Sequence, residues 1–342
     1  MSYQTLSWGR LAACAMLALG GASGTALLAQ DLTAVTLQLD AGYSGANAGF
    51  IVAKEKGFFE EAGLDVSITQ GKGSGSTAQI VGAKQADFGF SDGFVVANSV
   101  SQGVDIRMVG AIYRRNPTAI ITIEGSGIES PKDLEGRTLA LPTGVAAYQQ
   151  FPAYTRNCGI DAEKVRNVNV DQVSEEAALL AGQVDSIAAF AQSSLPALEL
   201  NTDKKLVTLW FADCGISTVG AGIIVHNDTI DERADLIAPF VEAAVKGFVY
   251  ARANPDETVD IVMKHQPATD PAIVRREQEL SWISWGTEAS MGLPLGRMDE
   301  GDWKITVDIV NENTTGEQIE TARVYTNDFA PTAEEYIPQK PE

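Results

Sequence analysis

Short apolar runs alternate with longer segments of helical character along the first part of the chain. Three runs bounded by polar residues or glycine are predicted strands, and they cover Val35–Leu39, Leu64–Thr69 and Phe88–Phe90. A helix is predicted over Ala46–Ala62, because Gly63 follows it as a C-cap. A second helix is expected to begin at Ser76, where Ser76-Thr77-Ala78-Gln79 fits a capping box. Strands that alternate with helices predict a parallel sheet.

The same order of elements then recurs. Predicted strands cover Thr138–Leu141, Val165–Val170 and Ser186–Phe190, and predicted helices cover Val145–Asn157 and Ser174–Ala181. Two segments align at an offset of 98 residues, which places Ser76 on Ser174, Ala83 on Ala181, Gln85 on Gln183 and Asp87 on Asp185. The repeat predicts two similar α/β lobes with a cleft between them.

The C-terminal part follows a different pattern. After the small-residue-rich β run of Thr218–Val225 come predicted helices over Arg233–Ala253, Pro255–Lys264, from Asp270 onward, and Asp299–Asn313. These helices have no strands of their own, so we expect them to pack on the first lobe. The hinge is expected near Pro117–Ile121 and Ser217–Gly222. The predicted domains are therefore residues 30–118 with 220–342 as the first lobe, and residues 119–219 as the second.

The amino end has the pattern of a secretory signal peptide. Arg10 precedes the apolar run Leu11–Leu19, and small residues lead to a predicted cleavage site near Ala29. Residues 1–29 are thus expected to direct export and to be removed. Two cysteines then remain, Cys158 and Cys214, which form either one disulfide or two buried thiols. Of these alternatives, the thiols are favoured.

The net charge and the small number of histidines disfavour several classes of function. The 342 residues include 45 acidic and 25 basic side chains, so the net charge is −20. Such acidity disfavours nucleic acid and anionic membranes as partners. His226 and His265 are the only histidines, which excludes a zinc-binding histidine pair at helical spacing and leaves few candidates for a catalytic triad. We predict a monomer with no catalytic residues, no metal and no cofactor.

Candidate contacts for a small ligand lie where the predicted strands end, since parallel α/β sheets bind ligands beyond the carboxyl ends of their strands. Tyr43 and Phe190 are candidates for stacking on a flat ligand, and Asp92 for accepting a ligand N–H. Some of the candidates have an ordinary structural alternative. Tyr43 and Tyr148 are then packed aromatics, Ser76 is a helix cap, and Asp92 is a turn residue. The predicted contacts are Asp40, Tyr43, Ser74, Ser76, Thr77, Asp92, Thr143, Tyr148, Phe190, Gln192 and Asp213.

Six segments of the chain share the motifs of one known family, and they are Ala53–Val66, Gly73–Thr77, Ala86–Asp92, Ser130–Gly136, Ala181–Asp185 and Pro294–Met298. They resemble the NMT1/THI5-like substrate-binding proteins of ABC importers. That group includes binders of taurine, sulfonates, nitrate, riboflavin and thiamine pyrimidine precursors. The resemblance implies a type II periplasmic binding protein, α/β, with two lobes of mixed, mostly parallel sheets and a hinged cleft. It also implies a periplasmic location and delivery of a solute to a permease with its ATPase.

The predicted cleft loops carry more carboxylates than cations. They contain Asp40, Asp92, Asp171 and Asp213 but only one basic residue, Lys72. This balance favours a flat nitrogen heterocycle of the pyrimidine or thiamine-precursor type, and the alternative is a small organic anion such as a sulfonate, nitrate or an aromatic carboxylate. A pyrimidine-synthesising THI5-like enzyme is disfavoured, because Cys158 and Cys214 are isolated where such enzymes carry a cysteine-rich run. A solute sensor for a receptor is a further alternative.

Overall fold

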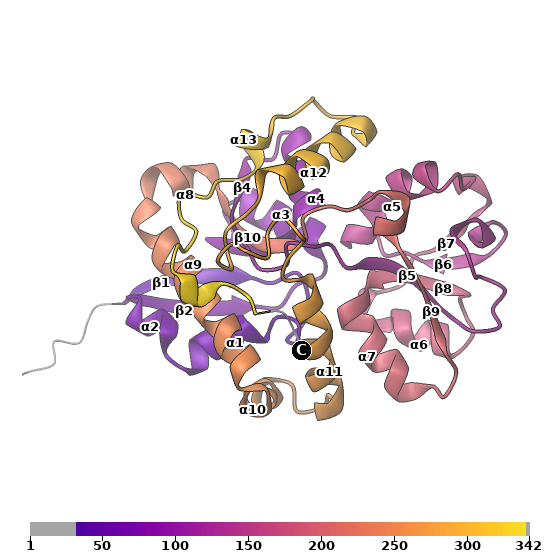
Figure 1. Cartoon of the computed structure of the whole chain (residues 1–342), viewed down its shortest axis with the longest axis horizontal. Coiled ribbons are helices and arrows are strands. Elements are labelled where there is room, and N and C mark those ends of the chain that lie inside the picture. Colours follow the sequence, from indigo (N-terminus) through magenta and orange to yellow (C-terminus); the bar gives the residue numbers. More distant parts are fainter. Residues whose placement is uncertain (1–31, 340–342) are drawn as a thin grey trace, which may run out of the picture. The chain divides into compact units, whose positions relative to one another are not determined.

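Ten strands of the computed structural model, which describes residues 32–339, form two five-stranded sheets (Figure 1). The first sheet has the order β2-β1-β3-β10-β4. Its strands are β1 (Thr33–Gln38), β2 (Leu64–Thr69), β3 (Phe88–Asp92), β4 (Ile106–Ala111) and β10 (Ala221–His226). Only β10 runs antiparallel to its neighbours, so the sheet is mixed but mostly parallel.

The second sheet repeats this arrangement, with the order β7-β6-β8-β5-β9. Its strands are β5 (Thr118–Ile123), β6 (Thr138–Ala140), β7 (Arg166–Val168), β8 (Ser186–Phe190) and β9 (Leu206–Trp210). Here β5 is the antiparallel strand and takes the place of β10. We call each sheet with its packed helices a lobe. The exact lobe boundaries stay a prediction, because the chain from Leu32 onward forms one compact unit.

A matching pair of side-chain clamps confirms the repeat. Asp87 accepts hydrogen bonds from the backbone N and Oγ1 of Thr36, both at 2.8 Å, and its own backbone N donates to Thr36 Oγ1. Asp185 does the same with Thr138, with both accepted bonds at 2.7 Å. Each clamp ties the turn before a central strand to the neighbouring strand, so the aligned aspartates have one structural role.

Glycine backbones correct two sequence predictions. The helix predicted over Ala46–Ala62 is two helices, α1 (Ala48–Glu55) and α2 (Phe58–Glu61), because Gly57 between them has φ 76°. The capping box at Ser76 is also wrong. Helix α3 (Ser74–Gly82) begins two residues earlier, after Gly73 with φ 112°, and Ser76 Oγ donates to Gly73 O from within the first turn.

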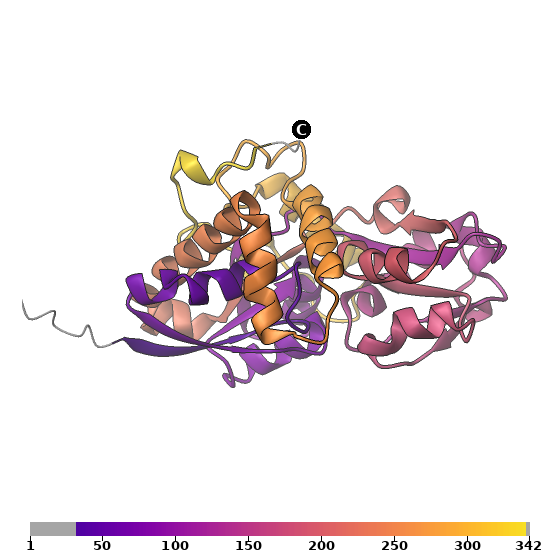
Figure 2. The same ribbon diagram turned by 90° about the horizontal axis from the view of Figure 1, so that it is seen from below.

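Other helices of the first lobe are α4 (Gly93–Ser101), α8 (Asn227–Glu232), α9 (Ala234–Ala253) and α10 (Pro255–His265). Three more follow: α11 (Pro271–Ser281), α12 (Glu300–Asn313) and α13 (Thr321–Val324). Figure 2 shows the C-terminal helices in orange beside the first lobe. As expected, α9 packs on α1. Helix α11 also contacts the second lobe, where Arg276 pairs with Glu199 at 3.0 Å.

The second lobe carries α5 (Ala146–Asn157), α6 (Glu175–Leu180) and α7 (Ala191–Asn201). The predicted hinge position needs correction, because Thr118–Ile123 is a strand bonded on both sides and Ala221 already belongs to β10. The chain instead crosses between the sheets at residues 112–117 and 211–220. These two crossings are joined by a hydrogen bond from Asn116 N to Thr218 O at 3.1 Å.

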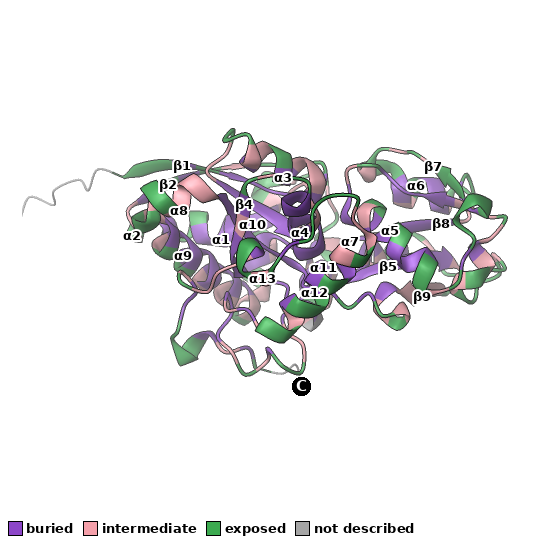
Figure 3. Cartoon of the chain, turned by 90° about the horizontal axis from the view of Figure 1, so that it is seen from above, coloured by how far each residue is buried: buried purple, intermediate pink, exposed green. Residues whose placement is uncertain are grey.

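Burial follows the strands, and the outward faces of the helices are exposed (Figure 3). Cys158 and Cys214 form a disulfide with a Cα–Cα distance of 5.4 Å, so the preference for two thiols was wrong. Beside it, the rings of Tyr154 and Phe211 stack at 4.1 Å. None of the helices in residues 32–339 is both long and apolar enough to cross a membrane. The predicted signal peptide, residues 1–29, lies outside the described residues.

Candidate functional site

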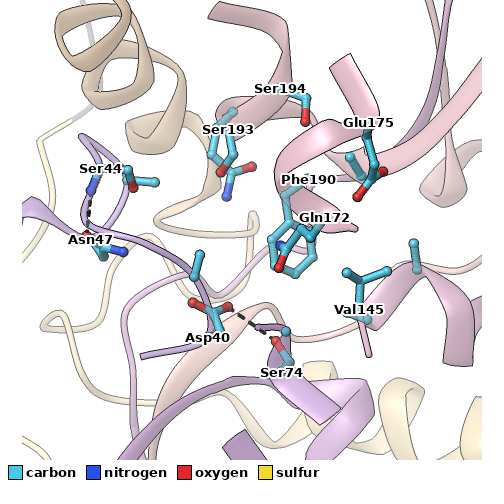
Figure 4. Close-up of a pocket in the computed structure, with 18 of the residues that line it drawn as sticks. Asp40, Ser44, Asn47, Ser74, Val145, Gln172, Glu175, Phe190, Ser193 and Ser194 are labelled. Carbon is cyan, nitrogen blue, oxygen red and sulfur yellow. Dashed lines mark hydrogen bonds between the residues drawn. The ribbon is translucent and has the colours of Figure 1, made fainter. Parts of the chain in front are cut away.

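A cavity of about 100 Å³ lies between the two lobes (Figure 4). The first lobe supplies the loop 40–47 and the start of α3. It also supplies Phe90 of β3, Tyr113 after β4 and Ala221, the first residue of β10. The second lobe supplies the start of α5, residues 172–176, the end of β8 and the start of α7. Both walls are built at the carboxyl ends of parallel strands, where α/β sheets bind ligands.

Asp40 is the buried carboxylate of the first wall. Its side chain accepts a hydrogen bond from Ser74 Oγ at 3.2 Å, and Figure 4 shows both residues on the same side of the cavity. Burial raises the pKa of Asp40 to about 6, although the bond from Ser74 opposes that rise. Asp40 is therefore held in place with its charge only partly compensated.

The loop after Asp40 is fixed by its own side chains. Asn47 Oδ1 accepts from Ser44 N at 3.0 Å, and Asn47 Nδ2 donates to Gly42 O at 2.7 Å. From α11, Glu277 accepts from Gly45 N at 2.6 Å. The first wall is thus a pre-shaped polar surface.

Two buried acceptors on the second wall have no protein partner. Within residues 32–339, Glu175 Oε2 and Gln192 Oε1 make no hydrogen bond, although their side chains are 2% and 3% exposed. Burial raises the pKa of Glu175 to about 9, and the neighbouring Glu176 adds to the rise. Buried polar atoms are normally paired, so these two atoms call for donors from a ligand.

Phe190 supplies the flat apolar surface of the second wall, next to Ala188 and Ala189 at the end of β8. In Figure 4 its ring faces the same space as Asp40 and Glu175. The lining side chains of the described chain include Asp40, Glu175 and Glu176 but no lysine, arginine or histidine. The cavity therefore combines an aromatic face with acceptors for N–H groups.

Four of the residues expected from the sequence line this cavity: Asp40, Ser74, Phe190 and Gln192. Glu175 was missed. The loop Asp171–Ser174 is marked by the repeat as a cleft loop, but nothing in the sequence shows that the next residue turns its carboxylate inward. The α6 helix begins at Glu175, and this start sets its direction.

Three residues expected in the first wall bond to their own lobe instead. Tyr43 donates its hydroxyl to Ile68 O at 2.9 Å, and its ring packs edge-on against His265. Ser76 and Thr77 donate to Gly73 O and Leu39 O. Their hydroxyls hold the turn that carries Ser74.

Asp92 lies behind the wall. It is fully buried, caps α4 through the backbone N of Phe94 and Val95, and accepts from Asn116 at 2.7 Å and from Gln150 at 3.1 Å. Burial raises its pKa to about 7. Asp92 thus joins the first lobe to a crossing segment and to helix α5 of the second lobe.

The remaining expected contacts lie elsewhere on the second lobe. Thr143 lines a separate pocket with Lys72 and Asp171. Tyr148 is 43% exposed, and Asp213 is exposed in the turn Phe211–Cys214. The register of α5 turns Tyr148 outward, whereas Ala146 and Ala147 face the cavity.

One cluster of metal-ligand side chains occurs within the described part of the chain, formed by Asp105, His226 and Asp228. Lys84 pairs with Asp228, and Asn227 donates to Asp105 Oδ1 at 2.5 Å. His226 Nδ1 accepts from Asp228 N at 3.0 Å. The cluster is bonded internally, so we assign it no metal.

Two mixed α/β lobes around a cleft, joined by two crossings, are the fold of the type II periplasmic binding proteins. The periplasmic aliphatic sulphonate binding protein SsuA from Escherichia coli matches with a TM-score of 0.67 and 14% identity, over 87% of this chain and 99% of that one. The NMT1/THI5 like family matches residues 45–258, and the chain belongs to that family.

The relatives in this family are mostly named as binding proteins. The riboflavin-binding protein RibY of Chloroflexus aurantiacus is 23% identical over 83% of this chain and 82% of its own length. The formylaminopyrimidine-binding protein of Halalkalibacterium halodurans is 22% identical over 80% of this chain and 84% of its own. One relative, from Legionella pneumophila, is named as a pyrimidine phosphate synthase.

Proposed function

We propose that this protein is the periplasmic solute-binding component of an ABC importer, and that it captures a flat nitrogen heterocycle of the aminopyrimidine type. The unpaired acceptors Glu175 Oε2 and Gln192 Oε1, buried beside the ring of Phe190, carry this proposal. A heterocycle with amino or ring N–H groups satisfies both atoms and places its face on the phenyl ring. The filled cleft then delivers the solute to the permease.

Charge favours this ligand over an anion. A sulfonate or nitrate in the cavity would meet Asp40, Glu175 and Glu176 with no cationic side chain from the described lining. Burying like charges together without a counter-charge is costly. The names of the riboflavin-binding and formylaminopyrimidine-binding relatives support a flat nitrogen heterocycle. The sulphonate-binding neighbour, at 14% identity, supports the fold alone.

A thermal-shift panel tests the proposal. Native mass spectrometry first checks the purified mature protein for any co-purified ligand. The thermal stability of the protein is then measured with pyrimidines, flavins, sulfonates, nitrate and aromatic acids. We expect a heterocycle to stabilise the protein by about 2.7 kcal/mol at a concentration ~100-fold above its Kd. Stabilisation by sulfonates or nitrate alone would contradict the proposal.

The variant Phe190→Ala sharpens the test. Loss of the ring face should weaken the best heterocycle by about tenfold, since an aromatic contact contributes roughly 0.5–1.5 kcal/mol beyond its buried area. Tyr148→Ala is the matched control, because Tyr148 is 43% exposed and does not line the cavity. Equal effects of the two substitutions would remove Phe190 from the site.

A further inference from the structure

Carboxyl groups from three separate elements lie at the cavity or directly behind its wall. Asp40 comes from the loop after β1, and Glu175 and Glu176 come from α6. Glu277 of α11 stands directly behind the loop 40–47, bonded to Gly45 N at 2.6 Å. One acidic side chain at a cleft is ordinary, but a convergence of four from three elements makes the cleft a favourable place for a positive charge.

The basic side chains of the packed elements are engaged elsewhere. On α11, Arg276 pairs with Glu199 of α7 and with Glu279, and Arg275 pairs with Asp256. Lys72, after β2, lines the neighbouring pocket. On α6 and α7 the other groups near Glu175 are Glu176, Gln192 and Ser194, and Ser194 donates to Glu176 at 2.7 Å. In the described chain, no basic group balances the carboxyls of this wall.

Burial disfavours the ionised forms of three of these carboxyls. Burial raises the pKa of Glu175 to about 9 and that of Glu277 to about 8, and Glu176 adds to both shifts. Burial alone accounts for the raised pKa of Asp40, about 6. A positive charge placed among these groups lowers their pKa values, because it favours the ionised forms.

We propose that the ligand is captured as an organic cation, such as a protonated amidine or aminoheterocycle, with Glu175 as its counter-ion and with release of one proton to solvent. This inference rests on the proposed function and adds the charge of the ligand. The balance is simple: neutral Glu175 and the cation combine to give the carboxylate–cation pair and one free proton. Phe190 gives the cation a flat aromatic face as well.

The test uses two probes of one shape and different charge, benzamidine as the cation and benzamide as the neutral form. Isothermal titration calorimetry of the mature protein is run at neutral pH in phosphate and in Tris, whose ionisation enthalpies differ. We expect benzamidine to bind at least about tenfold more tightly than benzamide. The binding enthalpy of benzamidine should differ between the two buffers by the difference in their ionisation enthalpies, for one proton released per ligand bound. Its affinity should rise by up to about tenfold per pH unit from pH 6 to 8.

Glu175→Gln supplies the matched variant, because it keeps the shape and removes the titrating group. It should abolish the buffer dependence and reduce benzamidine affinity to that of benzamide. Glu163→Gln is the control, since it makes the same chemical substitution at an exposed position. The wild-type buffer and pH dependence stand without any variant, so a folding defect in Glu175→Gln leaves the test intact.

The outcomes separate this inference from the proposed function. Cytosine, a neutral pyrimidine, and 4-aminopyridine, a flat cation, are titrated in parallel. Tight binding of cytosine without proton release overturns the cation inference and leaves the heterocycle proposal standing. Binding of sulfonates alone overturns both. Benzamide affinity equal to that of benzamidine also overturns the cation inference.

Discussion

Glu175 shows how a single residue departs from the rule that buried polar atoms are paired. Its carboxyl is 2% exposed, and Oε2 has no partner in residues 32–339. A buried carboxyl without a counter-charge destabilises the folded protein when it ionises. Such a group is expected at a functional site, where a ligand completes its bonding. The free energy of unfolding should therefore reveal it.

The pH dependence of stability follows from the direction of the shift. Folding raises the pKa of Glu175 from 4.5 to about 9, so its stabilising contribution is complete below pH 4.5 and is lost as pH rises to 9. Glu175→Gln has no such loss. Its unfolding free energy relative to wild type should rise by more than about 2 kcal/mol between pH 5 and 9 in urea titrations. Parallel curves for the two proteins would contradict this, and Glu163→Gln should follow wild type.

At the scale of elements, the disulfide fixes the far end of a helix whose near end lines the cavity. Cys158 ends α5, and Cys214 lies in the turn that follows β9. At the other end, Ala146 and Ala147 line the cavity wall. The bridge closes a loop with a sequence separation of 56 residues, and β7, β8 and β9 lie within that loop.

Removing the bridge should cost stability and leave the site intact. Loop closure over this length predicts a loss of about 4 kcal/mol for Cys158→Ser/Cys214→Ser. Reductant should lower the Tm of wild type toward that of the double variant and should not change the variant. Affinity for the ligand should change less than about threefold, because the bridge lies away from the cavity. An unchanged Tm in the variant would show that the bridge does not stabilise the fold.

The elements also show what the sequence can predict. Leu64–Thr69 and Ser186–Phe190 are strands at the predicted bounds, since turn residues flank compact apolar runs. The hinge predicted near Pro117–Ile121 falls on the strand Thr118–Ile123, because an apolar run in the sequence carries no sign of the two strands that bond to it. The repeat led to Ser74, Phe190 and Gln192. Glu175 and the disulfide depend on how distant segments meet, which no local pattern records.

For the whole molecule, one close approach of the two lobes is between glycine backbones. A Cβ on Gly73 would lie 2.2 Å from Gly144 O, and Gly75 N donates to Gly144 O at 3.2 Å. Two further bonds cross from the first lobe to α5: Gln150 donates to Asp92, and Asn98 donates to Gln149 at 2.9 Å. The lobes are therefore held together at one edge of the cavity by contacts that tolerate no extra side chain.

The added methyl group of Gly73→Ala should push the backbones of Gly73 and Gly144 apart and so keep the two lobes from closing as tightly. We expect affinity for the best heterocycle to fall at least about tenfold, since the walls would no longer meet around it. X-ray scattering should show a smaller decrease in the radius of gyration on ligand addition. Gly103→Ala is the control, because Gly103 also has a positive φ, 87°, but a Cβ there meets nothing within 4 Å. Equal losses in both variants would point to backbone strain alone.

The paired threonine–aspartate clamps also bear on how the two lobes arose. Thr36 with Asp87, and Thr138 with Asp185, are the same device in each half, as duplication of one ancestral α/β unit would leave them. Under the 98-residue offset that relates the two aspartates, Asp92 falls on Phe190, and each precedes the first residue of a helix. One of these equivalent positions joins the two lobes from behind the cavity, and the other lines the cavity. We infer that two copies of one unit came to differ at this position, where one now carries a buried structural carboxyl and the other a cavity-lining ring.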